Sequence, residues 1–67
     1  MSMQLTINGE AKQIDAGTVR ELLVSLELDK QAVAVEVNRE VVPKKLHETT
    51  ALKDGDTVEL VTLVGGG

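Results

Sequence analysis

Apolar and polar side chains alternate along residues 3–7, the period-2 pattern of a half-buried strand. Asn8-Gly9 follows, and this dipeptide accepts the two positive φ angles of a type I′ hairpin turn. We therefore expect residues 10–14 to return antiparallel. Their alternation is weak, because Lys12 and Ile14 share a face, which indicates a strand at the edge of a sheet.

A helix is predicted over residues Thr18–Glu27. Thr18 and Glu21 have the spacing of a capping box, in which the Thr18 hydroxyl accepts from the amide of Glu21 and the Glu21 carboxylate reaches back. Leu28 is expected to close the helix end over the core. One apolar stripe follows helical spacing behind the cap, at Val19, Leu22, Leu23 and Leu26.

Residues 33–37 alternate again and are rich in valine, which indicates a third strand. Asn38-Arg39 is expected to turn the chain into a short strand over residues 40–42, which Pro43 stops.

Periodicity is lost over residues 44–51, where we expect a loop with a helical turn. Leu46 and Leu52 are expected to anchor this loop to the core. Asp54-Gly55-Asp56 is a turn signal, and residues 57–64 are predicted to form the last and longest strand.

The predicted order of elements is ββαβ(β)β, an α+β fold in which one helix covers one face of a small sheet. The helix is long enough for a right-handed crossover, which places a later strand parallel to an earlier one. We expect one domain over residues 1–64, followed by a flexible glycine tail over residues 65–67.

Composition removes several classes of function. The chain of 67 residues has no Cys and no aromatic residue, which excludes thiolate chemistry and base-stacking platforms. Its net charge of −4 argues against binding a nucleic-acid backbone. Neither a signal peptide nor a membrane span is recognisable. The sequence therefore predicts a soluble, cytoplasmic protein that is monomeric when free of partners.

Gly65-Gly66-Gly67 is the least ordinary feature of the sequence. A frayed terminus or a cloning remnant is one interpretation. The other is a thin strand without side chains that carries the Gly67 carboxylate about 10 Å into a narrow channel of a partner. A carboxylate reacts only after activation, usually as an acyl-adenylate. Because the chain lacks a phosphate-binding loop, ATP and Mg²⁺ would be bound by the partner, and an amine, thiol or sulfide would then attack the carbonyl.

The last strand supplies a candidate docking patch beside the tail. If Val58 and Leu60 face the helix, then Glu59, Val61 and Leu63 face outward, with Val64 next to the glycines. Acidic residues such as Glu59 and Glu10 would suit a basic groove of a partner. The alternative is a scatter of ordinary surface residues.

Other candidates for chemistry are weaker. Asp54, Asp56 and Glu59 could hold a metal, but an Asp-Gly-Asp sequence is usually only a turn. His47 is expected to be an exposed loop residue. We therefore predict no metal, no cofactor of the chain's own and no catalytic residue.

The ordered combination of these motifs resembles the ThiS family of prokaryotic sulfur carriers, within the ubiquitin-like β-grasp proteins. The resemblance runs from end to end. It rests on Asn8-Gly9-Glu10, residues 18–23, residues 33–38, Val42-Pro43, Asp54-Gly55-Asp56, Val58-Glu59 and residues 64–67.

This resemblance implies a mixed sheet of four or five strands around residues 18–27, with the last strand central and parallel to the first. It implies that a ThiF-like adenylyltransferase adenylates Gly67, which then becomes a thiocarboxylate with sulfur from a cysteine desulfurase relay. A ThiG-like thiazole synthase would accept the sulfur. The chain would be a protein cosubstrate and not an enzyme.

Three alternatives remain open at this point. The chain could be a modifier that joins Gly67 to lysines of target proteins. It could be a carrier like the small subunit of molybdopterin synthase, or a noncovalent β-grasp module with an irrelevant tail.

Overall fold

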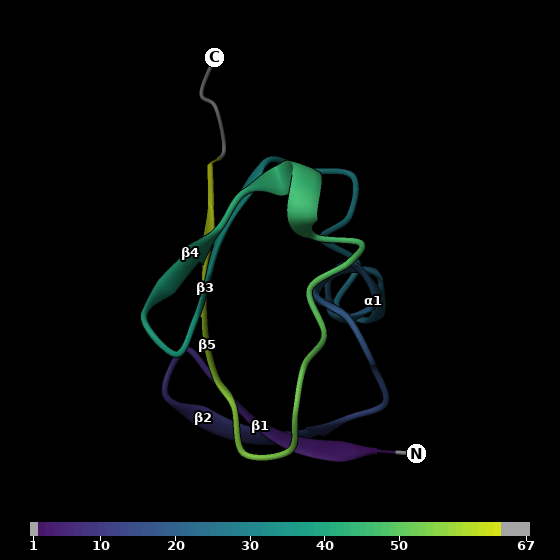
Figure 1. The fold of residues 1–67 in the computed structure, drawn as a ribbon, viewed down its shortest axis with the longest axis vertical. Coiled ribbons are helices and arrows are strands. Elements are labelled where there is room, and N and C mark those ends of the chain that lie inside the picture. The colour runs from purple at the N-terminus through teal and green to yellow at the C-terminus, as the bar shows by residue number, and fades with distance from the viewer. Residues whose placement is uncertain (1, 64–67) are drawn as a thin grey trace.

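The computed structural model describes residues 2–63. Five strands, one α-helix and one 3₁₀ turn form the fold (Figure 1). Their bounds are β1 Met3–Ile7, β2 Glu10–Ile14, α1 Val19–Ser25, β3 Val33–Val37, β4 Glu40–Val42, η1 Lys44–Leu46 and β5 Thr57–Thr62. The element order predicted from the sequence is confirmed.

The strands form one mixed sheet in the order β2-β1-β5-β3-β4. β5 is central, runs parallel to β1 and antiparallel to β3, as the resemblance implied. β2 lies at an edge, as the weak alternation of residues 10–14 predicted. In Figure 1 the sheet curves around one side of the core, and α1 lies on the other.

Both hairpins turn through two residues with positive φ. Asn8 and Gly9 have φ values of 51° and 85°, and Asn38 and Arg39 have 51° and 71°. This is the type I′ geometry, whose twist matches that of the flanking strands. Asn tolerates this left-handed backbone better than most residues. Arg39 adopts it although arginine has no such preference.

The start of α1 is capped almost as predicted. The Thr18 hydroxyl accepts from the amide of Glu21 at 3.2 Å. The Glu21 carboxylate reaches back to the amide of Gly17, at 2.6 Å, one residue before the amide that a capping box would place there. A Cβ at Gly17 would lie 3.2 Å from this carboxylate, so glycine leaves room for the contact.

α1 ends earlier than the predicted Glu27. Glu27 has a φ of 61°, a left-handed conformation that stops the helix. The amide of Glu27 donates to Val24 O at 3.0 Å, and the amide of Leu28 donates to Leu23 O at 2.8 Å. These two bonds are those of a Schellman motif, and Leu28 packs against the core as expected.

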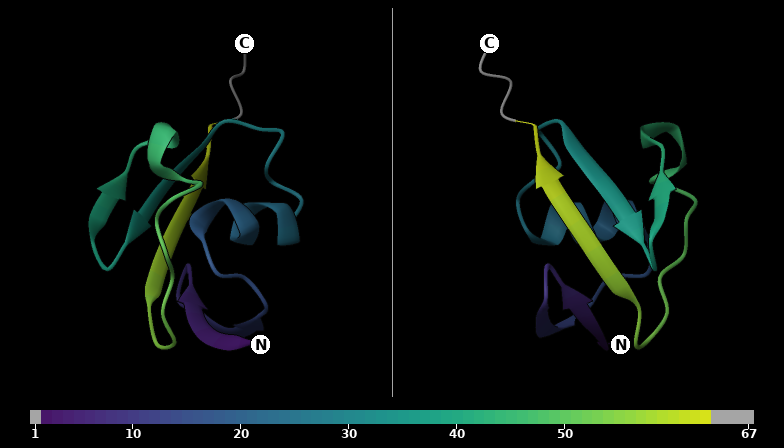
Figure 2. Two further views of the ribbon diagram at one scale, coloured as in Figure 1. Left: turned by 45° about the vertical axis from the view of Figure 1, so that its right-hand side comes forward. Right: turned by 90° about the vertical axis from the view of Figure 1, so that its left-hand side faces the viewer.

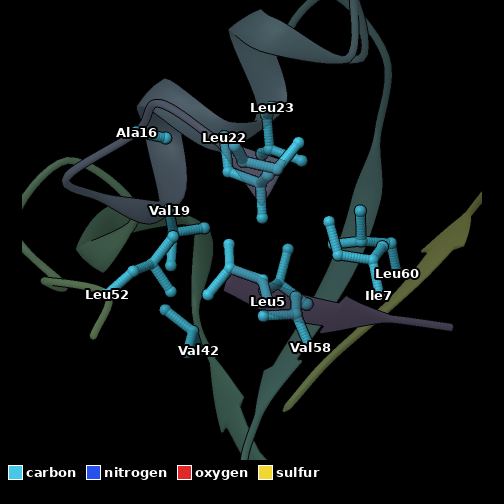
Figure 3. Packing of buried hydrophobic residues seen from close by; sticks show 12 residues of the cluster. Leu5, Ile7, Ala16, Val19, Leu22, Leu23, Val42, Leu52, Val58 and Leu60 are labelled. Carbon is cyan, nitrogen blue, oxygen red and sulfur yellow. The ribbon is translucent and has the colours of Figure 1, made fainter. Parts of the chain in front are cut away.

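The core lies between α1 and the sheet. Figure 3 shows Leu22 and Leu23 of the helix pointing toward Leu5 of β1 and Val58 of β5. Leu5, Leu22 and Val58 have no exposed surface. Within residues 2–63, the buried apolar residues are Leu5, Ile7, Ile14, Ala16, Val19, Leu22, Leu23, Val35, Val42, Leu52, Val58 and Leu60.

The segment between β4 and β5 differs from the prediction at two residues. Leu52 is buried, but Leu46 is 43% exposed, and His47 is buried with 7% exposure. The expected core position of Leu46 and surface position of His47 are therefore wrong. His47 is held inside because its Nε2 donates to Val42 O at 3.1 Å, and its own carbonyl accepts from the amide of Arg20 at 2.9 Å.

β5 is shorter than the predicted strand over residues 57–64. It ends at Thr62, although the amide of Leu63 still donates to Ala32 O at 2.8 Å. Val64 and the glycines at 65–67 lie outside the described residues. Within residues 2–63, no helix is long and apolar enough to span a bilayer.

Candidate functional site

The C-terminal end of β5 carries the residues predicted to dock a partner. Val61 is 57% exposed and Leu63 is 54% exposed. Glu59 is exposed as well, whereas Val58 and Leu60 are buried in the core. The alternation predicted for this strand is therefore present, and it leaves two large apolar side chains in contact with solvent.

Neighbouring strands extend this exposed surface. Ala34 of β3 lies opposite Val61, and Glu36 lies opposite both Glu59 of β5 and Val41 of β4. Val41 is the most exposed large apolar residue described, at 71%. Sequence reasoning missed Val41, although its position between two residues of a short strand, directly before buried Val42, is a signal that it faces outward.

Glu36 and Glu59 form a like-charge pair across two strands. Both are exposed, and no ion pair joins either of them to a cation within residues 2–63. Like charges directly opposite one another in a sheet are destabilising. The surface around Val61 therefore carries negative charge that the described chain does not neutralise.

Glu10, the second predicted acidic residue of the patch, is exposed and forms an ion pair with Lys12, with Nζ and Oε1 3.8 Å apart. It follows the β1–β2 turn, and that turn lies beside β5. The Asn8 side chain makes the contact, because Nδ2 donates to Leu60 O at 3.1 Å and Oδ1 accepts from the Leu60 amide at 2.8 Å. The structure thus places the β1–β2 turn next to β5, the strand that carries the predicted docking patch.

An open groove of about 700 Å³ reaches Leu63 from the helix side of the sheet. Its lining includes the apolar residues Leu23 and Val33, and also Lys44 and Lys45 of η1. The end of β5 is therefore accessible from both faces of the sheet.

The carboxylates of the acidic turn before β5 are engaged in hydrogen bonds. Asp54 Oδ1 accepts from the Gln4 amide at 2.6 Å. Asp56 accepts from the Lys53 amide at 2.8 Å and from Asn38 Nδ2 at 3.0 Å. Within residues 2–63, no three His, Cys, Asp or Glu side chains gather as metal ligands would. These carboxylates hold the turn, as the Asp-Gly-Asp sequence indicated.

Known proteins are similar to this chain over most of its length. A family model described as the ThiS family matches residues 5–67. The sulfur carrier protein ThiS of Bacillus subtilis is 42% identical over 53 residues, which cover 79% of this chain and 80% of that protein. The sulfur carrier protein ThiS of Escherichia coli is 35% identical over 66 residues, covering 97% and 100%.

A second kind of relative is much longer than this chain. A protein named thiazole synthase from Paramagnetospirillum magneticum is 47% identical over 66 residues, covering 97% of this chain and 20% of that protein. The chain thus spans a fifth of the length of that relative. Among solved structures, the thiamine biosynthesis protein (ThiS) of Geobacter metallireducens has a TM-score of 0.81 and 39% identity, covering 97% of this chain and 100% of that one.

Proposed function

The chain belongs to the ThiS family, and from this membership we propose that it is a sulfur carrier for thiazole formation in thiamine biosynthesis. Its Gly67 carboxylate is activated and then carries sulfur as a thiocarboxylate. The observation that carries the proposal is the family match, which runs through the fold and ends at Gly67.

Activation proceeds through a mixed anhydride. The Gly67 carboxylate attacks the α-phosphorus of ATP and releases pyrophosphate, which leaves an acyl-adenylate. A sulfur nucleophile, supplied by a relay from a cysteine desulfurase, then attacks the carbonyl carbon. The new C–S bond forms as the C–O bond to AMP breaks. Because the relay delivers its sulfur as a persulfide, the product is an acyl disulfide between Gly67 and the donor. A second thiol of the donor then attacks the donor's sulfur, which breaks the S–S bond, forms a disulfide and releases the thiocarboxylate. The carrier holds sulfur on its backbone terminus, and its sequence has no cysteine of its own.

The chain needs a separate enzyme for this chemistry. We assign ATP and Mg²⁺ to a ThiF-like adenylyltransferase, because the sequence has no glycine-rich phosphate loop followed by lysine. Gly65 and Gly66 let the tail enter a narrow channel, since neither residue has a Cβ. Val61, Leu63 and Val64 supply apolar contact beside the channel, and Glu59 supplies charge for a basic rim.

We assign the acceptor of the sulfur to a ThiG-like thiazole synthase. The support is the relative named thiazole synthase, in which a segment 47% identical to this chain makes up 20% of the length. A carrier and its acceptor that act in one reaction gain from being linked, because linkage raises their effective concentration.

The test is ATP–pyrophosphate exchange with the adenylyltransferase. Deletion of Gly67 and substitution Gly66→Val are expected to abolish exchange and to leave the thermal unfolding midpoint unchanged, because neither residue belongs to the described core. Lys12→Ala, on the edge strand β2, is the control and retains exchange. Unimpaired exchange by either tail variant would contradict the proposal.

A further inference from the structure

β5 has an open edge over its C-terminal half. In the antiparallel pair with β3, the residues of β5 bond to β3 at every second position. Asn38 N donates to Thr57 O at 2.7 Å, and Leu63 N donates to Ala32 O at 2.8 Å. Odd-numbered residues of β5 therefore direct their backbone groups toward β3, and even-numbered residues direct theirs to the opposite side.

β1 occupies that opposite side only at the start of β5. Its paired residues are Thr6 with Thr57 and Ile7 with Val58. The amide of Asn8 then donates to Val58 O at 2.9 Å, and the Asn8 side chain bonds both backbone groups of Leu60. The side chain substitutes for one more strand residue, and the ladder stops there because the chain turns away at Gly9.

Thr62 is the next even-numbered residue along β5. Its amide and carbonyl point to the side that β1 has left, and within residues 2–63 no backbone partner accepts from or donates to them. Figure 2 (right) shows the same arrangement, because the upper half of β5 has β3 on one side and no strand on the other.

The two outermost strands of the sheet, β2 and β4, are protected against strand pairing, and the open half of β5 is not. The outer edge strand β2 carries the charged residues Glu10 and Lys12, and β4 has three residues and is followed by Pro43. Short strands, charges and proline are the usual means of blocking an edge. At the open edge, Thr62 is uncharged and β-branched, and its neighbours Val61 and Leu63 are exposed and apolar.

We propose that this edge is a strand-addition site, at which an extended backbone segment of the activating adenylyltransferase hydrogen-bonds to Thr62 and continues the sheet along the tail. The inference rests on the proposed function, which supplies the partner. Strand addition gains affinity from backbone hydrogen bonds and specificity from alternate side chains. Here those side chains would contact Val61 and Leu63.

The position of the edge identifies the occupant. Four residues follow Leu63, so the Gly67 carboxylate lies at most about 14 Å further along an extended chain. A partner that reacts with Gly67 must lie beside the chain that follows Thr62. A partner strand paired with Thr62 would fix the direction from which the tail enters the partner's channel. The same pairing keeps the tail extended, which brings the reacting carboxylate to a defined distance from the sheet.

The substitution Thr62→Pro tests the edge. Proline removes the Thr62 amide hydrogen, which no described residue uses, and it fixes φ near −65°. The preceding residue is held in the extended backbone that a strand already has, and edge positions of this kind tolerate proline. We expect an unchanged unfolding midpoint and binding to the adenylyltransferase that is weaker by up to about tenfold, as loss of one hydrogen bond would cause. Thr62→Val keeps the amide and the side-chain shape, and is expected to bind normally.

Val61→Pro is the matched control for the fold. The Val61 amide faces β3, so proline there removes a ladder bond and the unfolding midpoint falls. An equal fall in Thr62→Pro would show that the Thr62 amide is paired within the free protein, which would overturn the inference.

Amide hydrogen exchange separates this inference from the proposed function. In the free protein the Thr62 amide is expected to exchange fast, and with the adenylyltransferase bound it is expected to become protected. Binding that leaves the Thr62 amide unprotected overturns strand addition and leaves the carrier function standing. Failure of the wild-type chain to bind overturns both, and protection that appears on self-association without the enzyme shows a second copy as the occupant and overturns the assignment.

Discussion

The substitution Asn8→Gly removes the two hydrogen bonds that join the β1–β2 turn to Leu60 of β5, at 2.8 and 3.1 Å. Glycine accepts the φ of 51° that Asn8 has, so the turn itself is retained. Each bond contributes about 1 kcal/mol net. The free energy of unfolding is therefore expected to fall by about 2 kcal/mol, or about 8–16 °C in midpoint for a domain of this size.

Asn8→Ala separates the hydrogen bonds from the backbone conformation. Alanine loses the same two bonds and also has a Cβ that disfavours positive φ, at an added cost of about 1 kcal/mol. The expected total loss is about 3 kcal/mol. Glycine and alanine variants of equal stability would show that the turn imposes no conformational cost at this residue.

Urea unfolding followed by far-ultraviolet circular dichroism is the assay, because the chain has no aromatic residue to report by fluorescence. The slope of stability against urea should be unchanged, since the variants alter stability and not the surface exposed on unfolding. If Asn8→Gly unfolds within about 0.5 kcal/mol of the wild type, the Asn8 side chain does not stabilise β5, and the reasoning is refuted.

Three further substitutions test other parts of the account by the same assay. Glu27→Gly is expected to stabilise the protein by about 1 kcal/mol, because Glu27 has a left-handed φ of 61°; no gain would contradict this. Glu59→Gln is expected to stabilise by a few tenths of a kcal/mol by relieving repulsion with Glu36, and a gain that does not shrink with added salt would argue against that cause. Leu22→Ala is expected to lower the free energy of unfolding by about 2–5 kcal/mol because Leu22 is fully buried. Leu46→Ala should lower it by less than about 1 kcal/mol. Similar losses for the two variants would show that Leu46 belongs to the core.

Local sequence signals predicted most of the fold. The Asn8-Gly9 dipeptide predicted a type I′ turn, and Thr18 with Glu21 predicted the helix start, because each signal depends on residues within one turn of chain. The pairing of β5 with β1 came from the family resemblance. Hydrophobic periodicity shows which face of a strand is buried and leaves strand order open.

The errors arose where tertiary contacts decide the outcome. Residues 44–51 have no periodicity, so the sequence did not show that His47 turns inward to Val42 O while Leu46 turns outward. The helix end at Ser25 depends on Glu27 adopting positive φ, which a glutamate does not signal. The open edge at Thr62 follows from the strand register and from the reach of Asn8, neither of which a local pattern contains.

Intact-mass spectrometry tests the central claim most directly. The chain is incubated with ATP, Mg²⁺, the adenylyltransferase and a sulfur donor, and fragmentation locates any change of mass. The account predicts a gain equal to replacement of one oxygen by sulfur, confined to the fragment that contains Gly67 and lost again when thiazole synthase and its substrates are added. Lysine-linked adducts in place of that gain, or an unchanged mass with active enzymes, would contradict the carrier function.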